Sequence, residues 1–311
     1  MKIYVLYARE NWITDVLAEE WIQNNRDLYT SDIDKADTIW ILSDYIIHKI
    51  PYYYLQNKRV VTTIHHIVPE KVTSRVRKHF KQLNTITDIF HSLCPSTTTE
   101  MQKYFNKPIL TLPFWNNEKD WFLLDEKENL RRNFGLGEDE FLVGSFQKDT
   151  ETASIWNGSI LPKLEKGPDL FVKAVEVLKK NRYPKLKVVL SGYYRHYIKR
   201  ELECRNIEYY YFEKASMSDL NKLYNTLDLY IVASRVEGGP RAINECALTC
   251  TPLLTTDVGV APYIVSPHSI FDGNNINSIL QARTDVKYNY SRAEKYMISN
   301  YMRNFTREIL L

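Results

Sequence analysis

The sequence lacks any long run of apolar residues. None of its 311 residues falls in a stretch that approaches the roughly 20 consecutive apolar residues of a membrane-spanning helix. The N-terminal segment Met1 to Tyr7 is apolar, but Arg9 and Glu10 follow too soon for a secretory signal peptide. We therefore expect a cytoplasmic protein without a membrane span.

An excess of charge is also missing. The chain has 41 lysine and arginine residues and 38 aspartate and glutamate residues, which gives a net charge of +3. A domain that binds nucleic acid usually carries a strongly basic face. The balance of charge therefore argues against nucleic acid as the main partner.

Cysteine is scarce, and its spacing excludes the common zinc motifs. There are four cysteines, none in a C-x-x-C pair. Cys246 and Cys250 are predicted to lie one turn apart on the same helix, but a metal pair would need a second half that the sequence does not supply. We expect reduced, buried thiols.

Tyrosine, in contrast, is abundant. Among the 22 tyrosines are the runs 52–54 and 209–211. Tyrosine stacks on sugars and bases and forms hydrogen bonds through its hydroxyl group. It is also an ordinary residue of β-strands, and that explanation has the greater weight.

Strand and helix patterns alternate in two consecutive series, which predicts an α/β protein with parallel sheets. The first series has predicted strands at 3–7, 37–42, 60–65, 86–90 and 109–112, with helices at 12–25, 72–83 and 98–105. The second has predicted strands at 141–146, 186–191, 207–212, 227–233 and 252–256, with helices at 169–180, 218–225 and 244–248. A linker at 113–139 contains one short helix at 127–134 and separates the two series. We expect domains at 1–118 and 119–290, with a tail helix at about 291–311 that belongs to the first.

The segment Glu237 to Glu245 is the most informative motif. It reads Glu-Gly-Gly-Pro-Arg-Ala-Ile-Asn-Glu and follows a buried strand. A strand, a glycine turn and a helix start present backbone N–H groups and a positive dipole end to an anion. Glu245 can accept hydrogen bonds from a pair of sugar hydroxyls, and Glu237 follows the end of the strand where ligands bind in open α/β sheets. A diphosphate joined to sugars fits this motif, although a Gly-Gly-Pro turn before a helix can also be purely structural.

Further motifs flank this segment in a fixed order. They are Phe141-Leu-Val-Gly144, Lys166-Gly-Pro-Asp-Leu170, Val188-Val-Leu-Ser-Gly192, the stretch 218–229 and Thr255-Thr-Asp-Val-Gly259. Together with the paired glutamates they resemble the donor domain of the retaining family 4 glycosyltransferases. The resemblance covers about 140–270 and implies the GT-B fold, in which two Rossmann-like domains face a cleft and the C-terminal helix crosses back to the first domain.

The first half resembles this family more loosely. The strand at 60–65 ends in His65, as on the acceptor side of the family's cleft, and 112–116 resembles the hinge between the domains. Two features depart from the family. The loop 8–12 contains no glycine, and Ser145 and Phe146 stand where a basic residue is usual. Lys148 could substitute for that residue, and 149–164 is predicted to be an insertion.

The resemblance implies a role for each candidate residue. His65 and Glu237 would contact the transferred sugar or the acceptor. Lys166 would bind the diphosphate, with the backbone at the glycine turn, and Glu245 would hold the ribose hydroxyls. The residues implied for donor binding are Lys166, Gly192, Tyr193, Tyr211, Phe212, Gly238, Gly239, Arg241, Ala242 and Glu245.

The implied activity is transfer of a sugar from a nucleoside-diphosphate sugar, such as a UDP- or GDP-sugar, to a hydroxyl of a glycan or lipid-linked glycan. The resemblance implies retention of configuration, with no cofactor and no metal. Asp32-Ile33-Asp34 has the spacing of an Asp-x-Asp metal motif, but a solvated turn explains it better. A hydrolase or epimerase of the same fold and a silent sugar-nucleotide-binding subunit remain as alternatives.

The basic segment 71–81 could indicate where the acceptor is found. It contains Arg75, Arg77 and Lys78 and could contact a membrane that carries a lipid-linked acceptor. A solvated helix face is the simpler interpretation.

Overall fold

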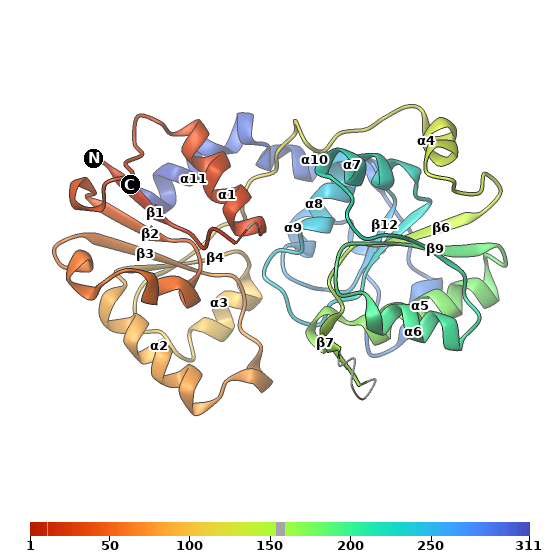
Figure 1. Ribbon diagram of the computed structural model, residues 1–311, viewed down its shortest axis with the longest axis horizontal. Helices are drawn as coiled ribbons and strands as arrows, with labels where there is room; N and C mark the ends of the chain where they lie inside the picture. Colours follow the sequence, from red (N-terminus) through yellow and green to blue (C-terminus); the bar gives the residue numbers. More distant parts are fainter. Residues whose placement is uncertain (11, 154–158) are drawn as a thin grey trace. The chain divides into compact units, whose positions relative to one another are not determined.

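The computed structural model describes residues 1–10, 12–153 and 159–311 (Figure 1). Asn11, in the loop without glycine, and 154–158, in the predicted insertion, lie outside the described residues. The chain divides into two compact units. Unit 1 comprises Met1–Trp115 and Ile298–Leu311, and unit 2 comprises Asn116–Met297.

Unit 1 is built on a parallel sheet with the order β1-β2-β3-β4-β5. Its strands are β1 (Ile3–Leu6), β2 (Thr38–Ile41), β3 (Arg59–Ile64), β4 (Ile89–Ser92) and β5 (Ile109–Thr111). Ile3 pairs with Thr38 of β2 on one side and bridges to Tyr29 on the other. After β1, the chain therefore first passes along one side of β1 at Tyr29 and then crosses to the other side to form β2.

Helices cover both faces of this sheet (Figure 1). On one face lie α1 (Ile13–Asn24) and α11 (Ile298–Leu310), and on the other lie α2 (Ser74–Ile86) and α3 (Pro95–Met101). Short 3₁₀ turns complete the unit: η1 (Ile33–Lys35), η2 (Asp44–Lys49), η3 (Tyr52–Leu55) and η4 (Pro69–Lys71). The strand predicted at 86–90 begins later, because Ile86 still belongs to α2, where it fills the core beside Phe80.

An aromatic cluster anchors the C-terminal helix to unit 1. Trp40 of β2 lies 5.9 Å from the rings of both Trp21 and Phe305, and 6.5 Å from Trp115. The indole N–H of Trp21 donates to the Thr306 hydroxyl at 2.9 Å, so α1 and α11 are joined by a buried polar contact as well. The end of the chain is thus an integral part of the first core.

The sequence predicts one helix over 291–311, whereas the structure has two. The first, α10 (Val286–Ala293), leads into a 3₁₀ turn, η8 (Glu294–Tyr296), and the chain extends at Met297 before α11. There, the N–H of Asn116 donates to the Tyr296 carbonyl at 2.7 Å. The two segments that connect the units run side by side at this point, and this tertiary pairing interrupts the helix.

The sheet of unit 2 has the order β10-β9-β6-β11-β12, with all strands parallel. The strands are β6 (Phe141–Ser145), β9 (Leu186–Ser191), β10 (Tyr209–Phe212), β11 (Leu229–Val232) and β12 (Leu253–Thr255). A hairpin of β7 (Thr150–Ala153) and β8 (Ile160–Pro162) follows β6. The chain moves outward from β6 and then crosses to β11, so the carboxyl ends of β6 and β11 flank the switch point at which such sheets bind ligands.

Helices cover both faces of this sheet (Figure 1), and a hydrophobic core lies on each face. One face carries α5 (Pro168–Asn181) and α6 (His196–Cys204), and the other carries α7 (Met217–Thr226), α8 (Arg241–Leu248), α9 (Ala261–Ile264) and α10. The remaining elements are α4 (Lys127–Asn133), η5 (Leu164–Lys166), η6 (Pro267–Ser269) and η7 (Ile276–Leu280). The sequence pattern did not predict α6. Cys250 lies beyond the end of α8 and so does not share a helix with Cys246.

Across residues 1–10, 12–153 and 159–311, no helix has the length and apolar character needed to cross a membrane.

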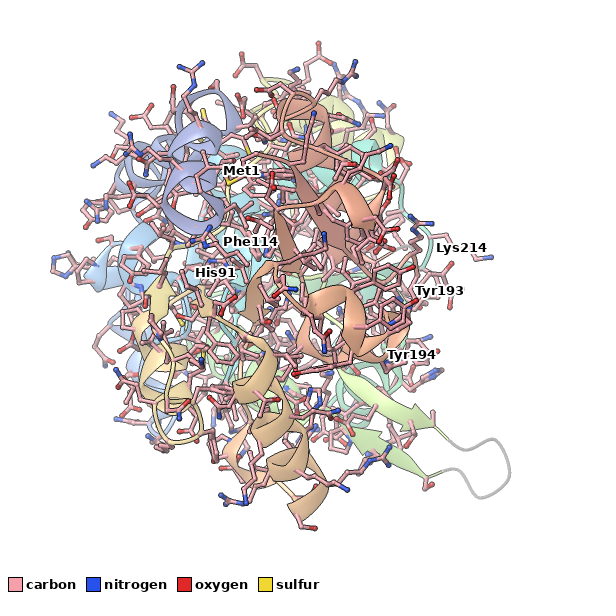
Figure 2. All side chains as sticks on the ribbon, turned by 90° about the vertical axis from the view of Figure 1, so that its left-hand side faces the viewer. Met1, His91, Phe114, Tyr193, Tyr194 and Lys214 are labelled. Carbon is pink, nitrogen blue, oxygen red and sulfur yellow. The ribbon has the colours of Figure 1, made fainter. Side chains whose placement is uncertain are left out.

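A buried histidine lies beneath the aromatic cluster. His91 Nε2 donates to the Leu112 carbonyl at 2.8 Å, and Nδ1 lies 3.0 Å from the Thr63 hydroxyl. Its ring packs edge to face on Phe114 at 5.3 Å (Figure 2). Burial lowers the pKa of His91 to about 4. The folded chain therefore holds this imidazole neutral.

This burial predicts a loss of stability in acid. Between pH 6.5 and 4 the unfolded chain protonates His91 and the folded chain does not, so the free energy of unfolding falls as pH falls. The shift corresponds to about 3 kcal/mol. Denaturant unfolding at a series of pH values should show a shallower decline for His91→Gln. Parallel curves for the two proteins would contradict the role given to His91.

Candidate functional site

The loop before α5 lies directly against the end of β11. Gly167 has a φ of +61°, and a Cβ atom there would lie 1.8 Å from the Ala233 carbonyl oxygen. The N–H of Arg235 also donates to the Glu165 carbonyl at 2.8 Å. Only glycine permits this approach, which places Lys166 beside the segment that leads into the motif.

An ion pair reinforces the same contact. The guanidinium of Arg235 donates to both carboxylate oxygens of Asp169, each at 2.7 Å. Burial tends to raise the pKa of Asp169, but the hydrogen bonds from Arg235 outweigh it and leave that pKa lowered. A planar guanidinium paired with a carboxylate in this way fixes orientation as well as distance.

Glu237 is the centre of a polar cluster at the switch point. Its side chain is 8% exposed and accepts hydrogen bonds from the Lys166 ammonium, the Ser234 hydroxyl and, at 3.3 Å, the Gln147 amide. Gln147 follows β6, and Ser234 follows β11. The structure thus brings together two of the expected site residues, Lys166 and Glu237.

The glycine turn follows at once. A Cβ atom on Gly259 would lie 2.5 Å from the Gly238 carbonyl oxygen, so the loop after β12 presses against the turn. Pro240 comes directly before Arg241, the first residue of α8. The first N–H groups of a helix have no acceptor within it, so those of α8 point out of its start beside Gly239.

Glu245 lies further along α8 in a largely apolar setting. It accepts a hydrogen bond of 2.7 Å from the Tyr224 hydroxyl. Tyr224 itself is buried against Trp121 and Phe146. Burial raises the pKa of Glu245, and the nearby Arg241 opposes that rise. The carboxylate is therefore held in a fixed position with Tyr224 as a neighbour that the sequence did not reveal.

The predicted base end of the site is formed by the edge of the sheet. Gly192, with a φ of +88°, donates its N–H to the Phe212 carbonyl at 3.2 Å and accepts from the Tyr211 hydroxyl at 3.0 Å. The structure therefore brings Gly192, Tyr211 and Phe212 together. Tyr193 and Tyr194 are 53% and 47% exposed (Figure 2).

At this edge, the Tyr211 ring is covered by a lysine side chain. The ammonium of Lys199 lies 4.5 Å from the Tyr211 ring centre. Burial raises the pKa of Tyr211 to about 12. Tyr193, on the loop itself, presents a more accessible ring than Tyr211.

His65 belongs to unit 1, just after β3. Its Nε2 lies 2.9 Å from the Leu42 carbonyl oxygen, to which it donates, and 3.1 Å from the Ser43 hydroxyl. The ring also lies 5.8 Å from Phe114. The histidine is thus oriented by the end of β2, with its Nε2–H directed to protein.

Several residues of the polar cluster have no recognisable signal in the sequence. Gln147, Ser234 and Arg235 carry no motif of their own. Their position alone distinguishes them, because each follows the carboxyl end of a buried strand next to the switch point. Asp169 was noted only as part of the glycine motif.

In the part of the chain that the structure describes, no three His, Cys, Asp or Glu side chains form a group that could hold a metal ion. Asp32 accepts from the Asp34 N–H at 3.1 Å and pairs with Lys35 at 3.0 Å. These are the contacts of a surface turn.

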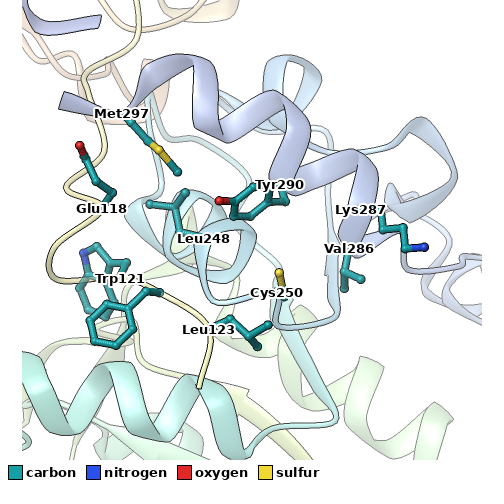
Figure 3. A pocket seen from close by; sticks show the side chains of 10 residues that line it. Glu118, Trp121, Leu123, Leu248, Cys250, Val286, Lys287, Tyr290 and Met297 are labelled. Atoms are coloured by element: carbon teal, nitrogen blue, oxygen red, sulfur yellow. The ribbon is translucent and has the colours of Figure 1, made fainter. Parts of the chain in front are cut away.

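A further cavity lies beyond the C-terminal end of α8 (Figure 3). Its volume is about 430 Å³, and none of the expected site residues lines it. The lining residues are Glu118, Trp121, Phe122, Leu123, Leu248, Cys250, Val286, Lys287, Tyr290 and Met297. The candidate site is therefore defined by the switch point and its polar cluster rather than by this apolar cavity.

Comparison with known proteins agrees with this geometry. A family model described as "Glycosyl transferases group 1" matches residues 148–301. No curated protein matches the chain by sequence. Solved structures are similar in fold, however. The Anabaena protein Alr3699/HepE, crystallised with UDP and glucose, is 13% identical, with a TM-score of 0.74 and 99% of each chain covered.

Two other structures extend the likeness. Sucrose-phosphate synthase from Thermosynechococcus elongatus is 14% identical at a TM-score of 0.70, covering 97% of this chain and 79% of its own. WaaG, a glycosyltransferase involved in lipopolysaccharide biosynthesis, is 14% identical at a TM-score of 0.64, with both chains fully covered.

The fold is thus that of the GT-B glycosyltransferases, as the resemblance implied. Residues 148–301 match the model of the glycosyl transferases group 1 family, and the chain is a glycosyltransferase.

The contact of Gly167 with Ala233 predicts a specific sensitivity. Gly167→Ala should lower the free energy of unfolding by about 3 kcal/mol or more, because it adds a backbone clash to a left-handed φ. Gly135 is the matched control, since it has a φ of +66° and open space around its Cβ position. Gly135→Ala should cost only about 1 kcal/mol. Denaturant unfolding with equal losses in both variants would contradict the close approach.

Proposed function

We propose that this protein transfers a sugar, with retention of configuration and without a metal, from a UDP-sugar to a hydroxyl acceptor. The observation that carries the proposal is the Lys166–Glu237 pair beside the start of α8, at the switch point of a group 1 domain.

The donor would bind with its diphosphate at the start of α8. The diphosphate would lie against Lys166 and the backbone N–H groups of Gly239, Arg241 and Ala242, next to Gly238. These groups combine a cation with preorganised dipoles at the helix start. Because they neutralise the diphosphate, the reaction would need no metal ion.

The nucleoside would extend from the diphosphate toward the sheet edge. Glu245, oriented by Tyr224, would accept hydrogen bonds from the ribose hydroxyls. The base would rest at Gly192 and Tyr193, beside Tyr211 and Phe212. We favour uracil because HepE has been crystallised with UDP and with UDP-glucose.

In the proposed reaction, the bond between the anomeric carbon and the diphosphate oxygen breaks, and UDP leaves with the bonding electrons. The acceptor oxygen bonds to the same face of the anomeric carbon, which retains the configuration. The departing phosphate takes the proton of the acceptor hydroxyl. Glu237 would stabilise the positive charge that develops on the sugar.

Unit 1 would supply the acceptor side. His65 would contact the sugar or the acceptor hydroxyl. The acceptor would be a glycan or a lipid-linked glycan. The exposed basic residues Arg75, Arg77 and Lys78 on α2 would favour peripheral contact with an anionic membrane, with the protein in the cytoplasm.

A donor panel tests this activity. The protein should release UDP slowly from one UDP-sugar and faster once a suitable acceptor is present. NMR of the product should show the anomeric configuration of the donor, and EDTA should leave the rate unchanged. An inverted product or a rate abolished by EDTA would refute the corresponding part of the proposal. Tight binding with no release under any acceptor would refute transfer.

Binding of UDP tests the residues. Lys166→Ala and Glu245→Ala should each weaken UDP binding by roughly 1–3 kcal/mol, the scale of a charge-assisted or buried hydrogen bond. Lys173→Ala, on the exposed face of α5, is the matched control and should change nothing. Calorimetric titration with unchanged affinity in both site variants would refute the assignment.

A further inference from the structure

A fully buried ion pair joins the carboxyl ends of β6 and β9, next to the switch point. Arg195 Nε lies 2.6 Å from Asp149 Oδ2, and both side chains are at most 2% exposed. The guanidinium also donates to the Ser145 hydroxyl at 3.0 Å and to the Ser191 carbonyl at 3.2 Å. Ser145 ends β6 and Ser191 ends β9. Burying such a pair adds little stability by itself, so its value lies in the positions that it fixes.

The carboxylate side of the pair fixes the segment after β6. Asp149 Oδ1 accepts from the Thr150 hydroxyl at 2.7 Å and from the Ile198 N–H at 3.4 Å. The Thr150 hydroxyl in turn accepts from the Tyr197 N–H at 2.9 Å. Asp149 and Thr150 therefore cap the first turn of α6 from outside that helix, which locks the start of the hairpin to the loop after β9.

Lys148 comes directly before this locked residue. Its ammonium lies 4.2 Å from the Tyr194 ring centre, a cation–π distance. The backbone N–H of Thr150 donates to the Tyr194 carbonyl at 3.1 Å, so the two segments are held together on both sides. Lys148 also lines the same small cavity as Lys166 and Gln147.

The position of Lys148 matters because the sequence lacks a basic residue directly after Gly144. The resemblance places a basic residue directly after Gly144, where this chain has Ser145. The structure puts the Arg195 guanidinium on the Ser145 hydroxyl, but Arg195 is buried and paired with Asp149. Lys148 is half-buried and lines the same small cavity as Lys166, where a diphosphate would bind.

We propose that Lys148 is a second diphosphate-binding cation beside Lys166, and that the buried Arg195–Asp149 pair is the device that positions it. This inference rests on the proposed function and names the residue that replaces the missing basic position. Lys148 would contact the ligand, and Arg195 would act through Lys148 as a positioning residue.

Calorimetric titration with UDP and with uridine separates a phosphate contact from a general disturbance. Lys148→Ala should weaken UDP binding roughly tenfold and leave uridine binding unchanged, because only UDP carries the phosphates. Lys199→Ala is the matched control, since Lys199 also lies over a tyrosine ring, that of Tyr211. Any effect of Lys199→Ala should fall equally on UDP and uridine. Equal losses for both ligands in Lys148→Ala would overturn the proposal.

A double-mutant cycle tests the positioning role. In the Arg195→Met background, Lys148→Ala should cause no further loss of UDP affinity, because Lys148 is no longer held in place. A merely structural role of Arg195 would leave the two effects multiplicative. Should Arg195→Met fail to fold, Ser145→Ala removes only one contact of the guanidinium and should shrink the effect of Lys148→Ala. An undiminished effect in that background would overturn the positioning role.

Failure of the inference differs from failure of the proposed function. A wild-type chain that binds neither UDP nor GDP overturns both. UDP binding that weakens with Lys166→Ala but not with Lys148→Ala overturns the inference alone.

Discussion

The candidate site depends on one close backbone contact, between Gly167 and the Ala233 carbonyl. No residue with a side chain fits there, since its Cβ would lie 1.8 Å from that oxygen. The contact brings the start of α5 against the end of β11, and the Arg235–Asp169 pair holds it from the surface side. Lys166 reaches Glu237 only because the two segments meet in this way. The rest of the polar cluster is arranged around that meeting point.

The pairing of Lys166 with Glu237 has a consequence for donor binding. Before a donor arrives, the two side chains neutralise each other in a site that is largely closed to water. In the proposed function, a diphosphate would compete with the carboxylate for the ammonium, and its greater charge would favour the exchange. Glu237 would then have one hydrogen-bond donor fewer and would stand next to the sugar, where positive charge develops during transfer. The same ion pair would thus link occupation of the phosphate position to the state of the carboxylate.

The sequence predicted the parts of the fold that local physics determines. The strand at 186–191 was predicted with its observed bounds, because the apolar residues at 188–190 lie between the turn signals Pro184 and Gly192. The site motif was predicted because glycines and a helix start leave a recognisable pattern. Tertiary contacts determined what was missed. The helix α6 begins where Asp149 and Thr150 cap it from a distant segment. The predicted C-terminal helix is interrupted at Met297 because Asn116 pairs with the chain there. Neither partner is visible from the residues around the element itself.

His65 shows how the surroundings of a residue narrow its chemistry. Nε2 lies 2.9 Å from the Leu42 carbonyl, which can only accept, so this nitrogen carries a proton and directs it to the protein. A proton committed in this way is not supplied to a leaving group. The leaving diphosphate does not need that proton, since Lys166 and the start of α8 would stabilise its charge. The orientation of the His65 Nε2–H therefore fits the proposed reaction, in which the phosphate itself would take up the proton of the acceptor.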